Sequence, residues 1–102
     1  MNLTILTPEK EIFRGEVTSV KVPGTMGEFQ VLPNHAPIVS SLETGAVELI
    51  TAKGSHRFFD EESGSIKTAE EPDKKMVFRI SGGFIEVLKN EISLLVRGTK
   101  NM

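Results

Sequence analysis

Hydrophobic and polar residues alternate over short stretches of this chain, and turn residues separate the stretches. Apolar side chains take every second position in residues 76–81 (MVFRIS) and 92–97 (ISLLVR). A period of two places these side chains on one face of an extended strand. Gly, Pro and Asn recur between such stretches, and no stretch has the period of a capped helix. The pattern therefore predicts an all-β protein, a flattened antiparallel β-sandwich or barrel.

About ten segments qualify as strands by this pattern. They are residues 2–7, 12–13, 15–23, 27–32, 38–42, 45–52, 55–59, 76–81, 83–89 and 91–97. Val17 and Val20 are out of phase, so we expect a β-bulge at residues 18–19 to restore the alternation. Asn90 tolerates a left-handed backbone, which predicts a tight turn between the last two segments.

Several of these strands carry apolar residues on both faces. Leu6, Ile50 and Leu95 are out of phase with the other apolar residues of their segments. One face can fill a core. The second face is then either a docking surface for a partner or part of a closed, strongly twisted sandwich that buries both faces. The sequence leaves both alternatives open.

Length and composition narrow the class of protein. Residues 1–102 have room for one domain, and we expect residues 60–75 (DEESGSIKTAEEPDKK) to form an exposed hairpin or mobile loop. The absence of cysteine excludes disulfides and thiolate metal sites, and a net charge of -2 without a basic cluster counts against nucleic acid as a partner. The apolar runs are far shorter than the roughly 20 residues that cross a bilayer. We therefore expect any membrane attachment to run through another protein.

Residues typical of catalysis are sparse. The two histidines, His35 and His56, lack the spacing of a zinc motif, and no serine lies in a nucleophile-elbow motif. Acidic residues are scattered rather than paired for acid–base chemistry. We therefore expect no catalytic residue, no metal site and no cofactor.

Residues 22–38 (VPGTMGEFQVLPNHAPI) carry more backbone constraint than a strand requires. Pro23 and Gly24 predict a turn, and Pro33 and Pro37 restrict both themselves and the residues before them. A loop stiffened in this way loses less entropy when a partner binds it. The ionisable groups of the segment are Glu28 and His35. We interpret the segment as a protein-recognition surface.

Three stretches together resemble one known family. They are TPEKEIFRGEV (residues 7–17), VPGTMGEFQVLPNHAP (residues 22–37) and SGGFIEV (residues 81–87). In sequence and spacing they resemble the epsilon subunit of bacterial F-type ATP synthase, which is called delta in mitochondria. The resemblance extends from Leu3 to about residue 99. It implies a β-sandwich of about ten strands, which family members usually follow with a two-helix hairpin.

The resemblance also implies a function and a location. Family members are non-catalytic rotor subunits of the central stalk, and they couple ion-driven rotation of the c-ring to ATP synthesis by clamping the gamma subunit to the ring. The expected partners are gamma and the c-ring, with the catalytic hexamer reached indirectly. The expected location is the cytoplasmic face of the bacterial inner membrane, as a peripheral protein. Whether H⁺ or Na⁺ is the coupling ion stays open.

Site residues follow from the resemblance position by position. The residues at c-ring-facing positions, expected at one end of the domain, are Met26, Gly27, Glu28, Phe29, Asn34, His35, Ala36 and Pro37. Those at gamma-facing positions are Thr7 and Ser40. Asn34 stands where the family usually has glycine, and because asparagine tolerates left-handed geometry we expect the turn to survive. Gln30 replaces another usual glycine.

Two questions remain open at this level. The chain ends at Met102, where family members continue into the helical hairpin that inhibits ATP hydrolysis. The sequence is compatible with a natural short form and with a truncated chain. We assign this chain no role in inhibiting ATP hydrolysis. The alternative to a stalk subunit is a free-standing β-sandwich adaptor or ligand-binding module with similar loops.

Overall fold

The computed structural model describes residues 1–101, with side chains up to Thr99. The strands are β1 (Asn2–Leu6), β2 (Glu11–Gly24), β3 (Gly27–Val31), β4 (Ile38–Leu42), β5 (Gly45–Asp60), β6 (Ser65–Ala69), β7 (Lys75–Ile80), β8 (Gly83–Leu88), β9 (Glu91–Val96) and β10 (Lys100–Asn101). The described residues contain no helix. The predicted all-β fold class is confirmed.

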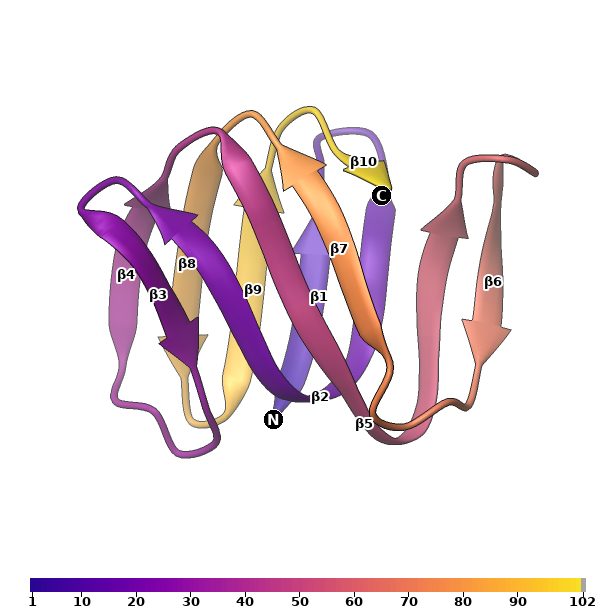
Figure 1. Ribbon diagram of the computed structural model, residues 1–102, viewed down its shortest axis with the longest axis horizontal. Coiled ribbons are helices and arrows are strands. Elements are labelled where there is room, and N and C mark those ends of the chain that lie inside the picture. Colours follow the sequence, from indigo (N-terminus) through magenta and orange to yellow (C-terminus); the bar gives the residue numbers. More distant parts are fainter. Residues whose placement is uncertain (102) are drawn as a thin grey trace.

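All the strands belong to one hydrogen-bonded sheet that folds over on itself as a sandwich (Figure 1). One layer contains the neighbours β1, β9, β8 and β4, and the other contains β3, β2, β5 and β7. β2 pairs with β1, β3, β4 and β5, so this strand belongs to both layers. Most pairs are antiparallel as predicted, but β1 and β9 run parallel, which is possible because a long connection separates them.

β-bulges explain why two strands are longer than the sequence pattern predicts. The pairing of β2 with β5 shifts register between Val17 and Ser19, which confirms the bulge expected at residues 18–19. A second shift lies between Gly15 and Val17. A bulge interrupts the alternation of side chains without ending the strand. The segments predicted separately at 12–13 and 15–23 are therefore one strand, and so are those at 45–52 and 55–59.

Turn geometry agrees with one prediction and corrects another. Lys89 and Asn90 both have positive φ, 49° and 62°, as a two-residue turn between antiparallel strands requires. The turn predicted at Pro23 and Gly24 is wrong, because both residues belong to β2 and the chain reverses at Thr25 and Met26. Gly24 serves close packing instead: a Cβ there would lie 2.8 Å from the Phe29 ring.

The core fills the space between the two layers. Its largest fully buried side chains include Phe13, Phe78, Leu49, Ile85 and Leu94, which come from five different strands. These residues occupy the inward phase of the alternation in their strands. Both layers therefore depend on one shared core, and what distinguishes the layers lies on their outward sides.

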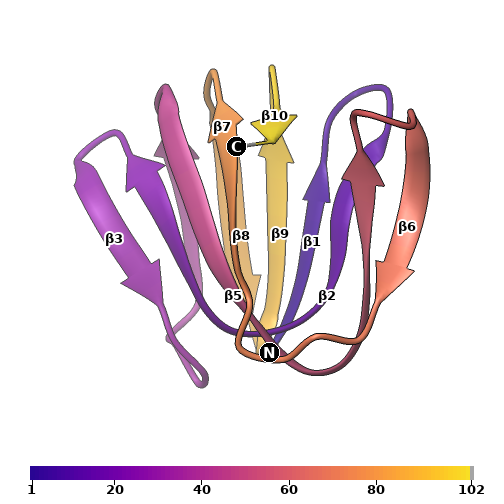
Figure 2. The same cartoon turned by 45° about the vertical axis from the view of Figure 1, so that its right-hand side comes forward.

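Residues 60–75 fold back beside the sandwich. β6 pairs with the second half of β5 to form a hairpin, and Figure 2 shows this hairpin and β3 on opposite sides of the molecule. Residues 70–74 then run under the sandwich toward β7 and are hydrogen-bonded to Thr51. We call residues 70–74 the strap.

Candidate functional site

The outward side of the layer β1–β9–β8–β4 carries a group of apolar side chains, with Glu86 and Ser93 beside them. Cross-strand pairing aligns Leu6, Leu95 and Phe84 in one row, and Val39 stands in the next row. The exposed fractions are 73% for Val39, 59% for Phe84 and 54% for Leu95. Large apolar side chains grouped and exposed in this way are typical of contact surfaces, which makes these residues candidates for one. We call Leu6, Val39, Phe84 and Leu95 the apolar face.

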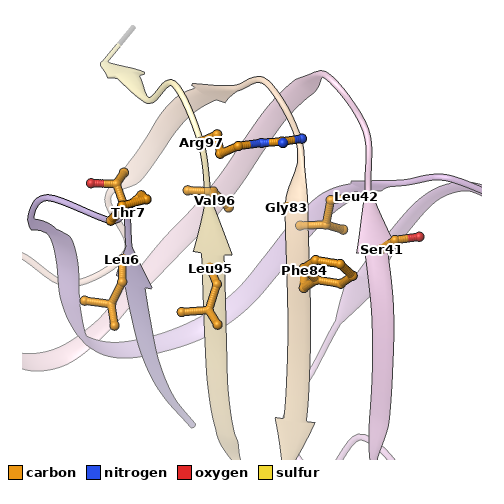
Figure 3. Close-up of a pocket in the computed structure, with 10 residues that line it drawn as sticks. Leu6, Thr7, Ser41, Leu42, Gly83, Phe84, Leu95, Val96 and Arg97 are labelled. Carbon is orange, nitrogen blue, oxygen red and sulfur yellow. The ribbon is translucent and has the colours of Figure 1, made fainter.

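A groove of about 590 Å³ runs along one end of the apolar face (Figure 3). Leu6, Leu95 and Phe84 line its floor, and the Arg97 guanidinium lies at its upper edge. Gly83 allows the floor to form, since a Cβ there would lie 2.2 Å from the Leu95 carbonyl oxygen. The groove thus offers apolar contact with one cationic group at its border.

The exposed face decides between the two alternatives that the sequence left open. Leu6 and Leu95 belong to an outward surface, so the sandwich does not bury both of its faces. Ile50, the third residue with this pattern, lies on the outward side of β5 with only 36% exposure, near Lys21 and Lys75. The apolar residues that are out of phase with the core therefore lie on the surface, and most of them are on the layer β1–β9–β8–β4.

The two gamma-facing candidates lie at or beside the apolar face. Thr7 lines the groove next to Leu6, and its Oγ1 accepts a hydrogen bond of 3.2 Å from the Lys10 backbone N–H, which closes the β1–β2 turn. Ser40 lies in β4 between Val39 and Ser41, but it is half-buried and its hydroxyl donates to the Ser41 carbonyl. Thr7 is thus a surface contact candidate, whereas Ser40 lies under the face.

The β2–β3 turn presents the first group of ring-facing candidates. Met26 at its tip is 99% exposed, and Gly27 has a φ of 124° that favours glycine. Glu28 points outward, with its Oε1 3.8 Å from the Lys21 ammonium. Phe29 is half-buried and packs against the core, so it anchors the turn rather than presenting a side chain.

The β3–β4 loop presents the second group. Asn34 has a φ of 67°, which confirms that asparagine supports the left-handed turn. His35 donates from Nδ1 to the Ala36 carbonyl oxygen at 2.7 Å, which leaves Nε2 on the outer side of this contact. Ala36 and Pro37 are exposed. The loop therefore offers one oriented imidazole beside two small, stiff residues.

A pair of asparagine side chains holds this loop. The Asn34 backbone N–H donates to Asn90 Oδ1 at 2.6 Å, and Asn90 Nδ2 donates to Asn34 Oδ1 at 3.1 Å. Asn90 belongs to the β8–β9 turn, so two parts of the chain far apart in sequence are joined. Sequence reasoning used Asn90 only as a turn residue and missed this role, because amide pairing between distant loops leaves no local pattern.

The two groups of ring-facing candidates do not share one end of the sandwich, which corrects the expectation. β3 runs from Gly27 to Val31 between them, so the Met26 turn lies at one end of the strand and the Asn34 loop at the other (Figure 1). Five residues of strand span about 16 Å. Both groups instead lie beside the same edge strand, β3, at its two ends. We call residues 26–37, from the Met26 turn to Pro37, the β3 border.

The outward side of β2, β5 and β7 is charged. Glu48 lies 2.8 Å from the Lys21 ammonium and 2.7 Å from the Lys75 ammonium. Hydrogen bonds from these two lysines lower the pKa of Glu48 to about 2. Gln30 and Ile50 border this cluster. We call Lys21, Glu48 and Lys75 the ion ladder.

The described residues form neither a cluster typical of a metal site nor a membrane-spanning helix. Among them no cluster of three or more His, Cys, Asp or Glu side chains has the arrangement of a metal site. No helix among residues 1–101 is long and apolar enough to cross a membrane.

Comparison with known proteins gives a consistent result. Residues 1–60 match the family described as ATP synthase, Delta/Epsilon chain, beta-sandwich domain. The chain is 40% identical over 93 residues to an ATP synthase epsilon chain of Chlorobium limicola, covering 91% of this chain and 84% of the relative. It is 37% identical over 95 residues to one from Leptospira borgpetersenii serovar Hardjo-bovis (strain JB197), covering 93% of this chain. The chain spans 59% of the length of the latter relative.

Solved structures support the fold. A chain in the cryo-EM structure of Euglena gracilis mitochondrial ATP synthase, OSCP/F1/c-ring in rotational state 1, superposes with a TM-score of 0.70 at 24% identity and covers 97% of this chain and 51% of its own length. A chain in the cryo-EM structure of the Tetrahymena thermophila mitochondrial ATP synthase central stalk and c-ring superposes with a TM-score of 0.60 at 18% identity. The match covers 98% of this chain and 65% of that chain.

Proposed function

Because this chain belongs to the delta/epsilon chain family of ATP synthase, we propose that it is a non-catalytic rotor subunit whose sandwich clamps the gamma subunit to the c-ring. The observation that supports the proposal is that one sandwich presents two chemically different surfaces around a shared core. One is the apolar face, and the other is the border along β3. A clamp requires two surfaces of this kind, held at a fixed distance by a shared core.

The apolar face is the proposed seat of gamma. Phe84 and Leu95 provide exposed apolar area of the kind that dominates binding energy when a partner excludes water from it. Thr7 lies at the margin of this area, where interfaces are usually polar. The half-buried Ser40 shapes the face from below rather than contacting gamma directly.

The β3 border is the proposed seat of the c-ring. It runs from the Met26 turn to the Pro37 end of the next loop, and Glu28 and His35 are its ionisable groups. The ion pair between Glu28 and Lys21 is long, at 3.8 Å, so an arginine or amide of a ring loop can compete for the carboxylate. Each such contact contributes about 0.5–3 kcal/mol, and grip therefore requires several together.

The proposed location follows from these partners. The c-ring is the proposed route of attachment to the bacterial inner membrane, and the sandwich then stands on its cytoplasmic face as a peripheral component. Rotation of the ring carries the sandwich and gamma together, and the catalytic hexamer is reached through gamma. We assign no bond-making step to this chain.

Reciprocal binding measurements test the clamp. The full chain is expected to bind both the purified gamma subunit and the purified c-ring of its own ATP synthase. Phe84→Asp should weaken gamma binding strongly and leave ring binding intact. The double change Met26→Ser with Glu28→Ala should have the opposite effect. Each variant is thereby the folded control for the other.

Two results would contradict the proposal. If the unaltered chain binds neither gamma nor the ring, the stalk role is lost and the free-standing adaptor becomes the better account. If each variant weakens binding to gamma and to the ring equally, the two surfaces are not separate binding sites and the proposed clamp is wrong.

A further inference from the structure

His56 occupies an unusual position in β5. The residue lies past the bend of the strand, opposite Gly15 of β2 and Ala69 of β6. Only 2% of the side chain is exposed, and among the described residues neither ring nitrogen has a hydrogen-bond partner. Burying a polar group without a partner costs free energy, so such an imidazole requires an explanation.

The surroundings of the ring favour its neutral form. His56 stacks on Phe13 with ring centroids 5.6 Å apart and an interplanar angle of 23°, and Phe58 lies 6.1 Å away. Gly15 makes room for it, because a Cβ there would lie 2.4 Å from the His56 Cβ. Protonation would give the ring two N–H donors and a positive charge in an apolar seat.

The strap is anchored near His56 along β2: Gly15 pairs with His56, and Val17, two residues further, pairs with Thr51. The strap is held by Thr51, whose backbone N–H donates to the Lys74 carbonyl and whose hydroxyl oxygen accepts from the Lys74 N–H, both at 2.9 Å. Glu71 and Lys74 are the charged strap groups that act on His56, and their charged atoms are 3.6 Å apart.

Several charged groups on the strands beside His56 make contacts of their own. Arg14 of β2 and Arg57 of β5 both contact Glu11 on the opposite side of the pair. Lys67 of β6 contacts Asp60. The charges that act on the imidazole are those of Lys74 and Glu71 in the strap.

We propose that His56 is an acid-sensitive latch, whose protonation releases the strap and β6 from the sandwich. The strap and β6 are the part able to move. Phe13, which stacks on the ring, is fully buried in the core, whereas the strap is exposed and is held by its hydrogen bonds to Thr51. An imidazolium can also draw Glu71 away from Lys74, which changes the path of the strap. This inference is independent of the proposed clamp.

The direction of the pH effect follows from the burial of the ring. Burial lowers the pKa of His56 below its usual 6.5, the Lys74 charge lowers it further, and Glu71 opposes both. Above about pH 6.5 the ring is neutral in the closed and opened states, so pH has no effect through this group. As the pH falls below that value the opened state binds the proton more readily, and closure is progressively lost.

Amide hydrogen exchange of the full chain, measured by NMR at about pH 7.5 and about pH 5, tests the latch. After correction for intrinsic rates, protection of the Lys74 and Asp73 amides should fall about tenfold or more at the lower pH, while Leu94 in the core keeps its protection. His56→Phe retains the stack without a titrating group and should abolish the difference. His35→Gln is the matched control and should retain it.

Direct titration keeps the test decisive if His56→Phe does not fold. In the unaltered chain, the His56 ring resonances and the strap amides should change with one common midpoint, below the usual histidine value of about 6.5. A His56 midpoint at or above that value, or strap protection that stays constant through the His56 titration, would overturn the latch.

Discussion

The two outward sides of the sandwich share one core but differ in chemistry. The apolar face on β1–β9–β8–β4 exposes Phe84 and Leu95 to solvent, whereas the ion ladder on β2–β5–β7 joins Lys21, Glu48 and Lys75. Opposite charges in contact satisfy each other, so the ion ladder needs no partner. Exposed apolar side chains gain free energy only when something covers them. The difference indicates which side of the molecule is built for association.

Adjacent residues of β9 make the strongest test of this contrast. Leu94 is fully buried and Leu95 is 54% exposed, although they are the same residue type in the same strand. Leu94→Ala should lower the free energy of unfolding by about 2–5 kcal/mol because it leaves a cavity. Leu95→Ala should cost about 0.5 kcal/mol or less. Urea denaturation of both variants measures the effect, and equal losses would show that Leu95 is part of the core.

A second comparison places one charge on each outward side. Phe84→Asp on the apolar face should weaken gamma binding by about 30-fold or more, equal to about 2 kcal/mol, as expected for a central aromatic contact. Ile50→Asp beside the ion ladder is the matched control and should leave the affinity unchanged. Calorimetric titration with gamma gives both values. A larger loss from Ile50→Asp would place the seat of gamma on the other side.

The loop at residues 32–37 joins the two sides, because it leads from β3 to β4. Asn34→Gly and Asn90→Gly keep the positive φ values but remove the paired amides. Each should lower stability by about 0.5–1.5 kcal/mol. Since both remove one shared contact, the double variant should cost less than the sum of the singles. Additive losses in a double-mutant cycle would contradict a coupled pair.

The smallest expected effect concerns the ion ladder. The pKa of Glu48 is lowered from 4.5 to about 2 by hydrogen bonds from Lys21 and Lys75, so its contribution is present above pH 4.5 and is lost as the pH falls toward 2. Glu48→Gln should therefore lower the urea midpoint slightly at neutral pH and leave it unchanged near pH 2. A difference that persists near pH 2 would mean that the ladder does not act through this carboxylate.

Much of the fold was predictable because core packing imposes a local alternation. The inward phases, the bulge at residues 18–19 and the left-handed Asn90 all follow from sequence and agree with the structure. For residues 60–75 the sequence left a hairpin and a mobile loop open, because the residues of β6, SIKTA, are nearly all exposed and are held by pairing with β5 rather than by a buried face. Such pairing is a non-local property.

The candidate site was less predictable. The ring-facing parts of the segment at residues 22–38 were expected at one end of the domain, although a strand separates them. Val39 and Phe84 were missed because each stands next to an apolar residue of the other phase, Ile38 and Ile85, so the sequence does not show which one faces outward. Only cross-strand pairing brings them beside Leu6 and Leu95. Surfaces assembled from several strands have no signature in one of them.

The 14-residue β2 has a mechanical consequence. It is bonded to β3 at one border of the sandwich and to β1 beside the apolar face. Interstrand hydrogen bonds lie across the strand direction, so a pull along β2 loads many of them in shear at once, whereas a sideways pull peels them one by one. The molecule should therefore be stiff along β2 and compliant across it. Single-molecule pulling from two pairs of attachment points would measure this anisotropy.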